Sequence, residues 1–128
     1  MAEVLVVDDS KTMRTILRKI LRELGYEVLE AADGKEALKV MEAEKTAIRL
    51  VLTDWNMPVM NGLELLKQLR QDRELSSLIV IMVTTETESE YMVAALEAGA
   101  NEYVMKPFTK DILKEKLEMV GILPLAGR

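Results

Sequence analysis

The chain has 128 residues, a formal net charge of −5, and neither cysteine nor histidine. This length suggests a single domain, and the acidic balance argues against non-specific binding of nucleic acid. Without cysteine or histidine, the chain can form no disulfide, no thiolate or imidazole metal site, and no histidine general base. It contains no run close to the roughly 20 apolar residues of a membrane span, and its start lacks the pattern of a signal peptide. We therefore expect a cytoplasmic protein.

Short apolar runs alternate with helical patterns along the chain. The runs are rich in β-branched residues and predict strands buried on both faces, at residues 4–7, 28–32, 50–53, 78–83 and 103–105. Apolar residues at helical spacing predict helices over 13–24, 34–44, 62–71, 89–99 and 109–120. Ser89 is the candidate N-cap of the fourth helix. The alternation predicts an α/β fold of βαβ units around a parallel sheet.

Polar residues follow most of the predicted strands directly. They are acids, hydroxyl residues and a lysine: Asp8, Asp9, Asp54, Thr84, Thr85 and Lys106. Parallel strands end at the same edge of a sheet, and open α/β sheets bind ligands beyond that edge. We therefore expect these side chains to lie close together.

Three clustered carboxylates favour a bound cation. Oxygen ligands alone favour a hard divalent ion, and Mg²⁺ fits best. Capping of the first helix by Asp9 or Ser10 would explain one acid but not the two others. A metal, a carboxylate, a hydroxyl and a lysine together suit phosphoryl transfer. Asp54 stands alone at its strand end and is the candidate nucleophile, whereas Asp8 and Asp9 are better placed to hold the metal.

Four segments then carry a family resemblance. "VLVVDDS", "TDWNMPVMNGLELL", "IMVTT" and "YVMKPFT" together resemble the receiver domains of two-component response regulators, most of all the stand-alone, chemotaxis-type members. The resemblance covers residues 3 to about 120, so we expect a receiver domain over 1–120 and a C-terminal tail over 121–128 that has no counterpart in the family. It implies the flavodoxin-like (βα)5 fold, with strand order 2-1-3-4-5 and helices on both faces.

The resemblance also implies the chemistry of the site. Asp54 would accept a phosphoryl group from a histidine kinase, Thr84 would donate a hydrogen bond to that group, and Lys106 would pair with it. The Lys106–Pro107 peptide bond would be cis. The protein would catalyse its own phosphorylation and the hydrolysis of the resulting phosphoryl group, without being a metabolic enzyme.

A metal site and a switch follow from the same resemblance. The Mg²⁺ ligands would be the side chains of Asp9 and Asp54 and the backbone carbonyl of Asn56, with Asp8 acting through water. Tyr103 would turn inward as Thr84 moves toward the phosphoryl group. This would reshape the face made by the helix over 89–99, the strand over 103–105 and the helix over 109–120. A downstream target protein would bind at this face, and we expect the protein itself to be a monomer.

Several neighbours of the site have simpler interpretations. Thr85 stands where the family usually has a smaller residue, and we expect it to narrow access to Asp54. Trp55 is expected to be partly exposed at the mouth of the site. The acids Glu86, Glu88 and Glu90 are expected to form a solvated face.

Four alternatives remain at this point. A phosphorelay intermediate would use the same site and differ only in its output. A flavin mononucleotide carrier would need a phosphate-binding loop after the first strand, where "DDSKT" places two acids instead. A phosphatase with an aspartyl nucleophile would need the D-x-D spacing that is absent here. A degenerate receiver that only binds partners conflicts with the complete set of acids, hydroxyl and lysine.

Overall fold

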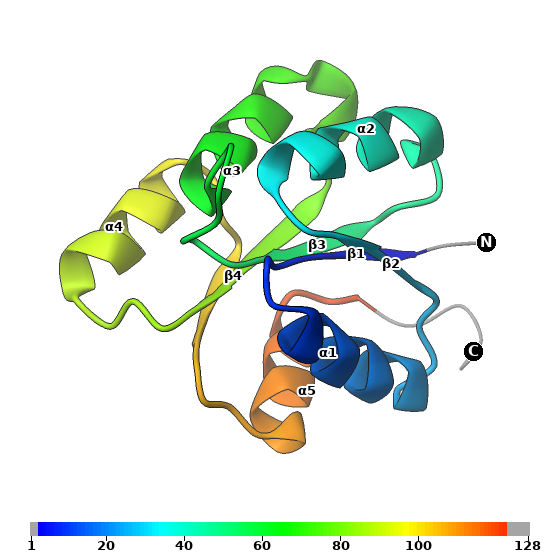
Figure 1. The fold of residues 1–128 in the computed structure, drawn as a ribbon, viewed down its shortest axis with the longest axis vertical. Helices are drawn as coiled ribbons and strands as arrows, with labels where there is room; N and C mark the ends of the chain where they lie inside the picture. The colour runs from blue at the N-terminus through cyan, green and yellow to red at the C-terminus, as the bar shows by residue number, and fades with distance from the viewer. Residues whose placement is uncertain (1–2, 123–128) are drawn as a thin grey trace.

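A computed structural model of the chain describes residues 3–122, and residues 1–2 and 123–128 lie outside the description. Its centre is a parallel sheet in the order β2-β1-β3-β4-β5 (Figure 1). The strands are β1 (Val4–Val7), β2 (Val28–Ala31), β3 (Leu50–Thr53), β4 (Ile79–Thr84) and β5 (Glu102–Met105). The helices are α1 (Lys11–Glu23), α2 (Gly34–Glu44), α3 (Gly62–Gln71), α4 (Ser89–Glu97) and α5 (Lys110–Met119), with a 3-10 turn, η1 (Arg73–Leu75). The predicted fold class and strand order are confirmed.

The helices cover both faces of the sheet. Helices α1 and α5 lie on one face, and α2, α3 and α4 lie on the other (Figure 1). Successive strand side chains point to opposite faces, so Val4 and Val6 pack with the α1 and α5 layer, whereas Leu5 and Val7 pack with the α2 to α4 layer. The sheet therefore separates two hydrophobic cores.

Strands β1 and β3 are buried along their whole length, as predicted, but the edge strand β2 is not. All residues of β1 and β3 are buried, while Val28, Leu29 and Glu30 of β2 are only partly buried. Glu30 pairs with Arg14 at 3.1 Å and with Arg18 at 2.8 Å. An edge strand has a neighbour on one side only, so polar side chains from α1 complete its cover. Within residues 3–122, no helix combines the length and apolar character needed to cross a membrane.

Side-chain caps set the start of most helices. Ser10, Asp33, Asn61 and Thr109 each accept a hydrogen bond from a backbone N–H in the first turn of the helix that follows. The prediction that Ser89 caps α4 is wrong. The N-cap is Glu88, which already has extended backbone angles and makes no side-chain cap bond, so Ser89 is the first helical residue.

We expect Asn61→Ala to lower the free energy of unfolding by about 0.5–2 kcal/mol, because Asn61 forms a capping box with Glu64. The matched control is Ser89→Ala, which removes a hydroxyl at a helix start without removing a cap, and it should change stability far less. Urea unfolding of the two variants measures both effects. Equal losses would contradict this assignment of the caps.

Candidate functional site

Strands β1 and β3 deliver two carboxylates to the same edge of the sheet. Val7 is paired with Thr53 in the parallel register, so Asp8 and Asp54 follow at equivalent positions. The ladder continues past both strand ends, because the Asp54 N–H donates to the Val7 carbonyl at 2.9 Å and the Asp8 N–H donates to the Ala31 carbonyl at 3.1 Å. The backbone therefore holds both acids in place before any side-chain contact is made.

Three carboxylates meet at this edge. Asp8, Asp9 and Asp54 each place an oxygen within 4.8 Å of the others. Asp8 is buried, Asp54 is partly buried and Asp9 is exposed, so the cluster opens to solvent on one side. Oxygen donors in this arrangement suit a hard divalent cation such as Mg²⁺. The cluster that the sequence predicted could therefore bind a metal.

Lys106 bridges two of the three acids. Its Nζ lies 2.7 Å from Asp8 Oδ2 and 3.0 Å from Asp54 Oδ2, and the Lys106–Pro107 peptide bond is cis. Burial acts to lower the pKa of Lys106, but the hydrogen bonds and negative charges of Asp8 and Asp54 outweigh burial and raise this pKa overall. Lys106 is therefore a cation at neutral pH. Three carboxylates and one ammonium leave the site with a net charge of −2.

The other carboxylate oxygens of Asp8 and Asp54 accept hydrogen bonds from backbone amides. The Ser10 N–H donates to Asp8 Oδ1 at 2.9 Å, and the Trp55 N–H donates to Asp54 Oδ1 at 2.6 Å. With Lys106 on the second oxygen of each acid, both carboxylates have a defined orientation. Such preorganisation is what a reacting carboxylate needs, because no further ordering is required in the transition state.

Helix α3 comes unusually close to the end of β3. The Gly62 N–H donates to the Trp55 carbonyl at 2.8 Å, and a Cβ added at Gly62 would overlap with the Asp54 carbonyl oxygen. Only glycine permits this approach. The "NG" of the sequence therefore has two functions: Asn61 begins the helix, and Gly62 lets it pack against the backbone of Asp54.

Thr84 and Tyr103 are joined through Glu86. Thr84 is fully buried, and its Oγ1 accepts a hydrogen bond from the Glu86 N–H at 3.2 Å. The Tyr103 ring is also buried, and its hydroxyl donates to the Glu86 carbonyl at 2.8 Å. Burial, and then the charges of Glu86 and Asp54, raise the pKa of Tyr103 to about 12. Thr84 and Tyr103, the two residues of the predicted switch, therefore both contact the backbone of Glu86 in the loop after β4.

Glu86 is the functional candidate that the sequence analysis missed. It was expected to belong to a solvated acidic face, yet its side chain accepts a hydrogen bond from Asn56 Nδ2 at 2.8 Å in addition to its two backbone contacts. The amide group of the Asn56 side chain is therefore hydrogen-bonded to Glu86. A carboxylate three residues before a helix gives no sequence signal that distinguishes it from its neighbours Glu88 and Glu90, which are exposed.

Trp55 is buried rather than partly exposed. Only 8% of its surface is accessible, because its ring meets Tyr91 of α4 edge to face, with centroids 5.0 Å apart and an interplanar angle of 84°. This geometry is a favourable one for aromatic pairs. The sequence could not indicate it, since the partner ring comes from a helix far along the chain.

Two exposed residues lie in the loops that follow β3 and β4. Thr85 is exposed, and its effect on access to Asp54 remains a prediction. Val59, in the loop between β3 and α3, is 76% exposed and has a φ of +69°. This backbone region is rare for a β-branched residue and costs on the order of 1–3 kcal/mol. No sequence pattern identified Val59 beforehand.

Comparison with known proteins gives one consistent result. The response regulator receiver domain family matches residues 4–118. The chain is 50% identical to chemotaxis protein CheY1 of Helicobacter pylori over 119 residues, which cover 92% of this chain and 95% of that protein. It is 48% identical to a CheY homologue of Campylobacter jejuni, over 92% of this chain and 91% of that protein.

Solved structures agree with the sequence relatives. Vibrio cholerae CheY4 superposes with a TM-score of 0.84 at 39% identity, covering 94% of this chain and 98% of that chain. A chain of the CheX–CheY–BeF3–Mg²⁺ complex of Borrelia burgdorferi superposes with a TM-score of 0.89 at 26% identity, covering 94% of this chain and 90% of that chain. The resemblance inferred from the four sequence segments is confirmed, and the chain belongs to the response regulator receiver domain family.

Proposed function

We propose that this protein is a phosphorylation-activated switch of a two-component system. It takes a phosphoryl group from a histidine kinase onto Asp54 and then binds a target protein in the cytoplasm. The observation that carries the proposal is the geometry of Asp54, whose carboxylate lies 3.0 Å from the Lys106 ammonium and within 4.8 Å of Asp8 and Asp9. The identity with chemotaxis proteins over 92% of the chain supports an output in chemotaxis.

The reaction needs few groups from this chain. An oxygen of Asp54 attacks the phosphorus of a phosphohistidine, a P–O bond forms, and the P–N bond to the donor breaks. Lys106 would neutralise the phosphoryl oxygens, and its Nζ lies 3.0 Å from Asp54 Oδ2. The fully buried Thr84 hydroxyl stands on the neighbouring strand, where it can donate to the same group. The product is an acyl phosphate.

A divalent cation suits the remaining charge of the site. Asp9, Asp54 and the Asn56 backbone carbonyl would hold Mg²⁺, and Asp8 would contribute through water. When bound, Mg²⁺ supplies charge neutralisation for the phosphoryl transfer. The net charge of −2 left by three carboxylates and Lys106 matches this requirement.

Glu86 connects the chemistry to the output face. A movement of Thr84 toward a phosphoryl group would disturb the bond between its Oγ1 and the Glu86 N–H, and the Glu86 carbonyl is the acceptor of the Tyr103 hydroxyl. The change would therefore reach β5 and α4 through the loop after β4. Exposed apolar side chains on α4, β5 and α5 offer the target a docking surface: Val93, Leu96, Met105 and Ile112.

The flavin carrier finds no support at the start of α1. A phosphate there would need free amide donors, but the Ser10 N–H donates to Asp8 and the Met13 N–H donates to Ser10 Oγ. The phosphorelay alternative shares the entire site and is separated from a chemotaxis output only by the partner. Adding the phosphorylated protein to a purified motor switch protein, and separately to a phosphotransfer protein, distinguishes the two outputs.

We expect Asp54→Asn to abolish phosphorylation by acetyl phosphate in the presence of Mg²⁺, because the amide cannot act as the nucleophile. Intact-mass spectrometry would detect the phosphate adduct in the parent protein and none in the variant. Asp72→Asn, an acid at the opposite edge of the sheet that pairs with Lys45, is the matched control and should keep the adduct. An adduct of undiminished yield in Asp54→Asn would refute the assignment.

We expect Asp9→Ala to weaken Mg²⁺ binding by more than about tenfold, since a direct ligand should matter at least as much as the outer-shell groups that cost this much. Calorimetry or the fluorescence of Trp55, whose N–H contacts Asp54, would report the titration. Glu97→Ala removes the same charge from the far end of α4 and should leave the affinity almost unchanged. A similar loss in both variants would mean that only net charge matters.

We expect the Tyr103 hydroxyl to make stability depend on pH in alkaline solution. Its pKa rises from an ordinary value of about 10 to about 12 in the folded protein, so its contribution is complete below pH 10 and is lost as the pH rises toward 12. Tyr103→Phe should remove this part of the loss and the tyrosinate absorbance that develops near pH 12, while phosphorylation by acetyl phosphate continues. Loss of absorbance near pH 10 instead, with the absorbance near pH 12 kept, would contradict the high pKa of Tyr103.

A further inference from the structure

The backbone of Asp8 is held from two sides. Its N–H donates to the Ala31 carbonyl of β2 at 3.1 Å. Its carbonyl, which lies past the end of β1, accepts a hydrogen bond from Arg14 Nη1 of α1 at 2.7 Å. A charged donor makes such a bond stronger than a neutral donor would. An edge strand and a helix therefore fix the backbone of Asp8 together.

Arg14 is itself held in place by β2. Its Nε donates to Glu30 Oε1 at 3.1 Å, and Glu30 Oε2 accepts a bond from Arg18 Nη1 at 2.8 Å. The side chain of Arg14 is 17% exposed, whereas that of Arg18 is 43% exposed. Because a guanidinium group is planar and rigid, the contact with Glu30 also sets the direction of the N–H that reaches Asp8.

This contact bears on Asp9, the next residue along the chain. The carbonyl of Asp8 and the N–H of Asp9 belong to one planar peptide unit, so fixing the carbonyl fixes the plane from which Asp9 continues. On the other side of Asp9, the Ser10 N–H donates to Asp8 Oδ1 at 2.9 Å, and the Ser10 hydroxyl caps α1. Asp9 is exposed. The direction of its carboxylate therefore depends on this backbone and not on burial.

We propose that Arg14 is a positioning residue for the metal site, because it holds the peptide unit that directs the Asp9 carboxylate toward Asp54. The inference rests on the proposed function, in which Asp9 is a ligand of Mg²⁺. A ligand that is ordered before the ion arrives loses less conformational freedom on binding. The positive charge of Arg14 opposes cation binding, but the Glu30 carboxylate offsets that charge.

Arg18 provides a matched control. It lies one turn after Arg14 in α1 and binds the other oxygen of the same Glu30 carboxylate. Methionine has an unbranched side chain and cannot donate a hydrogen bond. Arg14→Met and Arg18→Met each remove one positive charge and one bond to Glu30, but Arg14→Met also removes the bond to the Asp8 carbonyl. If charge alone mattered, both variants would bind Mg²⁺ more tightly than the parent protein.

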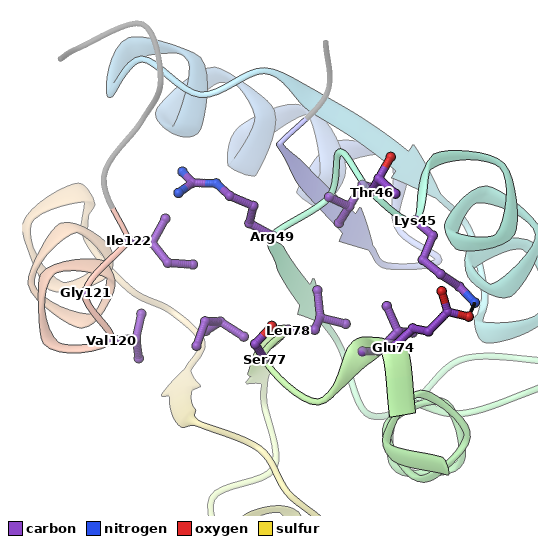
Figure 2. Close-up of a pocket in the computed structure, with 12 residues that line it drawn as sticks. Lys45, Thr46, Arg49, Glu74, Ser77, Leu78, Val120, Gly121 and Ile122 are labelled. Atoms are coloured by element: carbon purple, nitrogen blue, oxygen red, sulfur yellow. Dashed lines mark ion pairs between the residues drawn. The ribbon is translucent and has the colours of Figure 1, made fainter. Parts of the chain in front are cut away.

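We expect Arg14→Met to weaken Mg²⁺ binding by about tenfold in a calorimetric titration, which is the lower end of the cost of removing a group that orients a metal ligand. Arg18→Met should not weaken it. Lys45→Met removes a positive charge at the opposite edge of the sheet, where Lys45 pairs with Glu74 (Figure 2), and should leave the affinity unchanged.

The failure of this inference differs from the failure of the proposed function. Equal Mg²⁺ affinities in Arg14→Met and Arg18→Met, with binding by the parent protein, would overturn the positioning role alone. Absence of Mg²⁺ binding by the parent protein would refute the metal site of the proposed function and this inference with it.

Nuclear magnetic resonance of the metal-free protein gives a readout that is independent of affinity. Arg14→Met should shift the carbonyl carbon resonance of Asp8 and the amide nitrogen resonance of Asp9, because their shared peptide unit loses a hydrogen bond, and Arg18→Met should leave both resonances in place. In the folded parent protein, rotation of the Arg14 guanidinium group should be slow. Free rotation there would overturn the proposal without recourse to any variant.

Phosphorylation by acetyl phosphate separates a positioning role from a general structural one. At limiting Mg²⁺, Arg14→Met should be phosphorylated more slowly than the parent protein, because less of it has the ion bound. At saturating Mg²⁺, the two rates should agree. A loss of rate that saturating Mg²⁺ does not restore would contradict the proposal.

Discussion

The repulsion among three carboxylates at one sheet edge is the constraint around which the structure is organised. Asp8, Asp9 and Asp54 have oxygens within 4.8 Å of one another, in a site where Asp8 is buried, so their mutual repulsion is weakly screened. Lys106 offsets part of it by contacting two of the acids. The remaining charge is the physical reason why this cluster could hold a divalent cation.

The carboxylate cluster does not disrupt the hydrophobic cores, because the cluster and the cores lie in different parts of the fold. The cores on the two faces of the sheet use the buried side chains of the central strands, whereas the acids lie one residue beyond those strands. Backbone bonds from Asp8 and Asp54 to neighbouring strands extend the ladder into the loops. The rigidity of the sheet is thereby passed to the site without burying all of its charges.

The two edges of the sheet have different chemistry for the same topological reason. Parallel strands place all their ends together, so polar residues that follow strands collect at one edge. The residues that precede strands collect at the other, and here they include Ile48 and Leu78. The first edge gathers acidic side chains and Lys106, whereas the second gathers buried apolar side chains. In the proposed switch, the link from the phosphorylation site to the output face starts at the first edge, where Glu86 contacts both Thr84 and Tyr103.

The sequence by itself determined the order and type of the elements and the meeting of Asp8, Asp54 and Lys106. Both follow from local signals, because apolar periodicity marks each element and parallel strands must end at one edge. Only the tertiary structure decided that Trp55 is buried against Tyr91 and that Glu86 contacts Asn56 and Tyr103. These partners come from segments distant in the chain. Contacts of this kind depend on how loops and helices are arranged in space, and local sequence patterns do not determine that arrangement.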